Sequence, residues 1–178
     1  IVGLIMGYRA YNAFNRDKAF IIEFRPNPKR WADNFVGSSN PIRDVANWSP
    51  EIKYFKDGKL SDEIRNIPKD RGGIYMFYLK GTNLPFAEYY ILYIGRALLS
   101  SKENIYKRAI HYQNDERDLI KEMFENWKDD LYYRYYLDTD NEVIKQNEVA
   151  LIRSIVPPYN EVIPKKIVKQ PKIKAFGL

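Results

Sequence analysis

The sequence predicts an α+β fold: a small three-stranded sheet, mixed or antiparallel, flanked by helices and preceded by an N-terminal extension. Two observations predict it. Three runs rich in tyrosine and β-branched residues are typical of strands, at 71–81, 88–95 and 131–137. Helical patterns follow the second and third runs, which gives the order ββααβα. This order lacks the regular strand-helix alternation of parallel α/β folds.

The first two runs are expected to form an antiparallel pair. Tyr75 and Tyr93 would then face the same side, and Gly73 and Gly95 would leave room for a phosphate or another backbone. Aromatic residues favour strands in any case, and the chain has 15 tyrosines. A purely structural role for both tyrosines is therefore the alternative.

Three helices are expected around this sheet. The first covers 100–113, with Ser100 or Ser101 as its N-cap. The second, 116–130, is clearly amphipathic, and the third, 140–156, is stopped by a pair of prolines.

The chain divides into three parts by composition. Residues 66–164 form the predicted core, and residues 1–65 form an extension with one convincing strand at 19–24, a possible arm for DNA recognition or dimerisation. The tail 165–178 holds five lysines and no acidic residue, so it supplies most of the net charge of +6. Such a tail is either a solvated terminus or an arm that binds a polyanion.

Composition excludes several classes of site. With no cysteine, the chain has no disulfide, zinc-thiolate site, iron-sulfur cluster or thiol nucleophile. No apolar run approaches the roughly 20 residues of a membrane span, and the first residues do not resemble a signal peptide. We therefore expect a cytoplasmic protein without a membrane partner.

The first helix carries an arginine on its apolar face. Helical spacing places Arg108 with Ile105, Ala109 and Tyr112, and His111 lies beside that face. An arginine in this position either serves a site or packs its stem on the core while its head reaches water.

The third helix carries a glutamate on its apolar stripe. Glu148 lies between Ile144 and Leu151, where carboxylates are rare unless they are paired or bind a cation. Glu148 is thus a candidate metal ligand, with a salt bridge to Arg108 as the alternative. The turn after this helix ends at Asn160, whose amide is expected to reach back to the sheet.

Together these motifs resemble the GIY-YIG nuclease family. The resemblance covers roughly 67–161 and consists of five landmarks in order: Gly73-Ile74-Tyr75, Tyr93-Ile94-Gly95, the arginine helix, the glutamate helix and Pro157-Pro158-Tyr159-Asn160. Three features depart from the family pattern. Seventeen residues separate Tyr75 from Tyr93, Arg96 stands where lysine is usual, and Tyr112 rather than His111 lies four positions after Arg108.

The resemblance implies a metal-dependent endonuclease that hydrolyses phosphodiester bonds in DNA. Glu148 would bind one Mg²⁺ or Mn²⁺ per active site, and Arg108 would clamp the developing charge. Tyr75 would act as general base, supported by Tyr93 or His111, if neighbouring cations lower its pKa. Tyr112 is a further candidate catalytic residue, as the alternative to His111 at the position after Arg108. Asn160 would have a structural role near the chemistry.

Double-stranded DNA is the expected partner. Candidate DNA-binding residues are Arg25, Arg30, Arg96, Lys107, Lys165, Lys166 and Lys169. A compact core without a zinc module favours a restriction or phage-defence enzyme, and a homodimer would cut both strands of a symmetric site. Repair and homing nucleases, and a non-catalytic nucleic-acid-binding protein of the same fold, are the alternatives.

Overall fold

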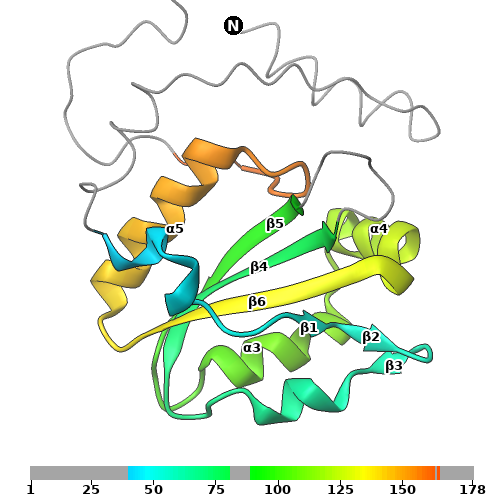
Figure 1. Cartoon of the computed structure of the whole chain (residues 1–178), viewed down its shortest axis with the longest axis horizontal. Helices are drawn as coiled ribbons and strands as arrows, with labels where there is room; N and C mark the ends of the chain where they lie inside the picture. The colour runs from blue at the N-terminus through cyan, green and yellow to red at the C-terminus, as the bar shows by residue number, and fades with distance from the viewer. Residues whose placement is uncertain (1–39, 81–88, 163, 165–178) are drawn as a thin grey trace, which may run out of the picture. The chain divides into compact units, whose positions relative to one another are not determined.

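The computed structural model describes residues 40–80, 89–162 and 164, all within one compact unit (Figure 1). The strands are β1 (Ile52–Lys53), β2 (Phe55–Lys56), β3 (Lys59–Leu60), β4 (Gly72–Lys80), β5 (Tyr89–Ala97) and β6 (Leu131–Asp138). The described α-helices are α3 (Ile105–His111), α4 (Asp118–Trp127) and α5 (Asn141–Ile155). Short 3-10 turns are η1 (Pro41–Arg43), η2 (Val45–Asn47), η3 (Asp62–Asn66), η4 (Tyr112–Asn114) and η5 (Lys128–Asp130).

The main sheet is antiparallel and has the strand order β1-β6-β4-β5, while β2 and β3 form a separate two-stranded hairpin. β4 lies in the middle and pairs with β5 and β6. Tyr75 on β4 is opposite Gly95 on β5 and Tyr135 on β6. The predicted α+β class and the antiparallel pairing of the first two strands are confirmed.

Helices cover both faces of the sheet (Figure 1). Side chains alternate along β4, so Tyr75 and Phe77 pack with residues of α3 and α4, whereas Ile74 packs with residues of α5. The core is therefore split into two clusters, one on each face. The cluster beneath α3 and α4 is rich in buried aromatic rings.

The sheet has four strands where the sequence predicts three. The additional strand, β1, comes from the predicted extension, and its Ile52 pairs with Tyr133 on β6. Tyr54, next in the chain, is fully buried and donates a hydrogen bond from its hydroxyl to the carbonyl of Ala109 (2.6 Å). The folded core thus continues across the predicted boundary at residue 65. A two-residue strand is too short to form the kind of tyrosine- and β-branched-rich run from which the other strands are predicted.

The predicted helices are present, with one correction at a start. α3 begins at the N-cap Asn104, whose side chain accepts a hydrogen bond from the backbone N–H of Lys107 (2.7 Å), and neither Ser100 nor Ser101 caps it. Ser100 instead accepts hydrogen bonds from two backbone N–H groups of the preceding turn. α5 begins after the N-cap Asp140 and ends at Ile155, with Val156 as its C-cap immediately before the predicted proline stop.

Some predictions fall outside the described residues: the strand at 19–24, the basic tail, and the candidate DNA-binding residues Arg25, Arg30, Lys165, Lys166 and Lys169. Within the described residues, no helix has the length and apolar character needed to cross a membrane.

The turn after α5 protects the outer edge of β5. The Asn160 side chain donates to the carbonyl of Ile94 (2.8 Å) and accepts from its backbone N–H (2.9 Å). The neighbouring Tyr159 N–H donates to the carbonyl of Leu92 (3.0 Å). An edge strand otherwise leaves such groups without a sheet partner. Asn160 therefore makes the hydrogen bonds that a neighbouring strand would make at this edge of β5. Its side chain points back toward the sheet, as predicted.

We expect Asn160→Ala to lower the free energy of unfolding by about 1–3 kcal/mol, because it leaves two buried backbone groups of Ile94 unpaired. Urea unfolding measures the change. Asn114→Ala, at an exposed position in η4, is the matched control. A loss no larger than that of the control would show that these bonds do not hold the edge of β5.

Candidate functional site

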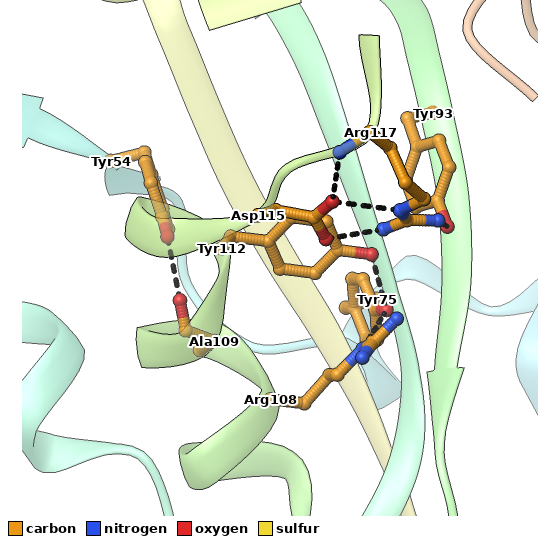
Figure 2. Close-up of polar contacts among 8 residues, drawn as sticks. All are labelled: Tyr54, Tyr75, Tyr93, Arg108, Ala109, Tyr112, Asp115 and Arg117. Atoms are coloured by element: carbon orange, nitrogen blue, oxygen red, sulfur yellow. Dashed lines mark hydrogen bonds and ion pairs between the residues drawn. The ribbon is translucent and has the colours of Figure 1, made fainter. Parts of the chain in front are cut away.

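Three tyrosine side chains meet beneath α3. Tyr75 comes from β4, Tyr93 from β5, and Tyr112 from the turn that follows α3 (Figure 2). The hydroxyl oxygens of Tyr75 and Tyr112 are 2.7 Å apart and share a hydrogen bond. The ring centroids of Tyr75 and Tyr93 are 6.5 Å apart. The two motif tyrosines therefore face the same side of the sheet, as the antiparallel pairing predicts.

The glycines of the two motifs make room for protein atoms. A Cβ at Gly95 would overlap with the Tyr75 hydroxyl, which crosses this position from the neighbouring strand. A Cβ at Gly73 would overlap with the backbone carbonyl of Tyr136 on β6. The expectation of another backbone close by is thus confirmed at Gly73. At Gly95 the space expected for a phosphate is filled by a phenol.

Arg108 joins the tyrosine cluster from α3. Its Nε donates a hydrogen bond to the hydroxyl of Tyr75 (3.1 Å), and its guanidinium lies over the ring of Tyr112, 5.1 Å from the centroid (Figure 2). Ile105 and Ala109, on the same face of α3, are buried. Arg108 therefore faces inward, as the helical spacing predicts.

His111 and Tyr112 are separated by the end of α3. Tyr112 is buried and hydrogen-bonded to Tyr75, whereas His111 is exposed. The tyrosine cluster therefore contains Tyr112, four positions after Arg108, while His111 lies on the surface.

Burial dominates the ionisation of the phenols. It raises the pKa of Tyr75 far above its ordinary value of 10, although Arg108 acts in the opposite direction. Burial also raises the pKa of Tyr112. The expectation that neighbouring cations lower the pKa of Tyr75 is not met by the described side chains, because the desolvation of a fully buried phenolate exceeds the effect of one guanidinium.

Glu148 lies on α5, among buried apolar residues of the second cluster. Its side chain is 13% exposed and forms an ion pair with Arg96 on β5, whose side chain is 38% exposed. The alternative of a salt bridge with Arg108 is wrong, because the partner of the Glu148 carboxylate is Arg96. The charge of Arg108 lowers the pKa of Glu148 less than that of Arg96 does.

Burial raises the pKa of Glu148 above 4.5, and the two arginines offset this only in part. A bound metal ion would stabilise this carboxylate further, because burial still disfavours its negative charge. Within the described residues, no three acidic or histidine side chains converge to form a ready-made metal site. Magnesium, however, is often bound by one or two carboxylates, with water and phosphate completing its shell. Glu148 fits a site of this kind.

An ion pair absent from the sequence motifs adjoins Tyr93. Asp115 and Arg117 form a two-pronged salt bridge, with Nε–Oδ1 and Nη2–Oδ2 distances of 2.8 and 2.6 Å. The third guanidinium nitrogen donates to the Tyr93 hydroxyl (3.3 Å) (Figure 2). The sequence does not predict this pair as part of a site, because an acidic and a basic residue two positions apart are common in surface turns.

The remaining predicted residues have structural contacts. Lys107 donates from Nζ to the backbone carbonyls of Ser101 (3.4 Å) and Lys102 (3.1 Å), at the start of α3. Asn160 holds the β5 strand on which Tyr93 and Arg96 lie. Its contact is with the backbone, in agreement with its predicted structural role.

Comparisons of the chain with protein-family models, with curated proteins and with solved structures find no significant match.

The raised pKa of Glu148 predicts a pH-dependent stability. The folded protein holds this proton more tightly than the unfolded chain does, so wild-type protein should lose stability relative to Glu148→Gln as pH rises from about 4.5 through the raised pKa. Urea unfolding of both proteins between pH 4 and 7 measures the difference. Glu125→Gln, exposed on α4, is the control. A wild-type protein that gains stability relative to Glu148→Gln over this range would contradict the dominance of burial.

Proposed function

We propose that this protein is a divalent-metal-dependent endonuclease that hydrolyses phosphodiester bonds in DNA. The observation that carries the proposal is the position of Arg108, which is partly buried on α3 and donates from Nε to the hydroxyl of the fully buried Tyr75. Arg108 lies on α3, Tyr75 on β4 and Glu148 on α5. Cation, carboxylate and phenol together suit the hydrolysis of a phosphate ester.

Glu148 is the residue that would hold one Mg²⁺ or Mn²⁺. When bound, the ion supplies positive charge that stabilises the scissile phosphate and the leaving oxygen. Glu148 must release Arg96 from at least part of its carboxylate to take this role. The partly exposed side chain of Arg96 is then free to pair with a DNA phosphate, in line with the DNA-binding role predicted for it.

Arg108 is suited to bind the phosphate that is cleaved. Its Nε is engaged by Tyr75, so its position is fixed before substrate arrives. A pre-positioned guanidinium requires little rearrangement when negative charge develops on the phosphate oxygens.

The proposed acceptor for the proton of the attacking water is a phenolate, formed after a tyrosine hydroxyl has lost its own proton to solvent. As water oxygen bonds to phosphorus, the ester oxygen leaves and the water proton passes to the phenolate. Tyr75 and Tyr93 are the candidates, with His111 left on the surface. The strongly raised pKa of Tyr75 favours Tyr93 as the acceptor and a positioning role for Tyr75 and Tyr112.

The motif order that resembles the GIY-YIG family supports this reaction, and the compact core without a zinc module favours a restriction or phage-defence enzyme. Double-stranded DNA is the proposed substrate. A homodimer is proposed because two active sites are required to cut both strands of a symmetric site in one binding event.

One observation favours a second candidate, a non-catalytic DNA-binding protein of the same fold. The carboxylate of Glu148 is already neutralised by Arg96, and such a pair is also a stable end state. The two functions differ in one respect: the binding protein would bind DNA without metal-dependent cleavage.

We expect Glu148→Ala to keep its fold and its affinity for DNA but to lose cleavage by at least about 100-fold, because the metal ligand is removed. Plasmid cleavage with Mg²⁺, with and without chelator, measures activity, and a gel-shift assay measures DNA binding. Glu125→Ala, exposed on α4, should cleave like wild type. Metal-dependent cleavage retained by Glu148→Ala would remove Glu148 from the site, and the absence of cleavage by wild-type protein would favour the second candidate.

A further inference from the structure

Arg117 is held in a fixed orientation beside Tyr93. Asp115 accepts three hydrogen bonds from this arginine, two from the guanidinium and one from its backbone N–H (3.1 Å). The Asp115 side chain is 13% exposed, and the pKa of Asp115 is lowered by Arg117, so the pair stays ionised at neutral pH. A two-pronged salt bridge fixes the plane of a guanidinium more firmly than a single hydrogen bond does.

The fixed guanidinium makes contact with the tyrosine cluster in two ways. Its free edge donates to the Tyr93 hydroxyl, and its centre lies 5.7 Å from the ring centroid of Tyr93 and 5.6 Å from that of Tyr112. Figure 2 shows Arg117 between Asp115 and Tyr93, on the side of the cluster away from Arg108. The two motif tyrosines therefore have separate cationic donors, Arg108 for Tyr75 and Arg117 for Tyr93.

We propose that Asp115 and Arg117 are positioning residues that hold the Tyr93 hydroxyl for proton transfer. The inference rests on the proposed nuclease function. A guanidinium donor stabilises the phenolate that forms when the Tyr93 hydroxyl loses its proton to solvent, and this phenolate can then accept a proton from the attacking water. Asp115 has no contact with the reacting atoms in this scheme, since its role is to fix Arg117.

The competing explanation is structural. Arg117 precedes α4, and its contact with Tyr93 joins the loop before α4 to β5. Loss of this contact would then lower stability or activity whether or not Tyr93 has a hydroxyl. A role in proton transfer, in contrast, requires that the effect of Arg117 depend on the Tyr93 hydroxyl.

A double-mutant cycle separates the two explanations. Plasmid-cleavage kcat and KM are measured for wild type, Arg117→Met, Tyr93→Phe and the double variant. We expect Arg117→Met to lower kcat by at least about tenfold with KM within about threefold, and to change kcat less than about twofold when Tyr93 is already phenylalanine. Arg65→Met, an exposed arginine paired with Asp62 on η3, is the control and should change neither.

A second measurement needs no activity. In protein labelled with ¹³C at the tyrosine ζ carbon, the Tyr93 signal is the one lost in Tyr93→Phe. It should shift in Arg117→Met and Asp115→Asn and stay in place in Arg65→Met.

The outcomes are distinct. Wild-type cleavage with an equal kcat loss from Arg117→Met in both Tyr93 backgrounds, or an unmoved Tyr93 signal, overturns the positioning role and leaves the nuclease standing. The absence of cleavage by wild-type protein overturns the proposed function, and the proton-transfer role with it.

Discussion

Arg108 places a cation inside the aromatic layer between α3 and the sheet, and the site depends on this contact. The guanidinium donates to Tyr75, packs over Tyr112 and lowers the electrostatic cost of the Glu148 carboxylate. A half-buried charge is tolerated only when its donors have acceptors nearby. Here those acceptors are phenols, and the same contacts that satisfy the arginine also orient the hydroxyl groups.

The positions of these phenols depend on close packing within the sheet. Gly95 leaves the space that the Tyr75 hydroxyl fills, and Asn160 holds the β5 edge on which Gly95 lies. Arg117 fixes Tyr93 from the other side. The glycines of the two motifs thus have a physical explanation in close packing against protein atoms, whether or not a substrate binds nearby.

Much of the fold could be predicted because its signals are local. The runs of tyrosine and β-branched residues in β4, β5 and β6 and the apolar stripes of α4 and α5 lie in consecutive residues. β1 is too short to form such a run. The partner of Glu148 could not be predicted, because the sequence does not distinguish Arg96 from Arg108, and only the packing of β5 against α5 decides between them. Arg117 was missed because its interaction with Tyr93 joins residues 24 positions apart and has no repeated pattern.

The charge of Arg108 is expected to link the phenol cluster to Glu148. This link can be tested through the pKa of Glu148, measured from its side-chain carboxyl carbon by NMR in wild-type protein and in Arg108→Met. We expect a pKa above 4.5 in wild type and a higher one in the variant, because a favourable cation is removed while burial remains. An identical pKa in both proteins would show that Arg108 and Glu148 are not linked and belong to separate parts of the structure.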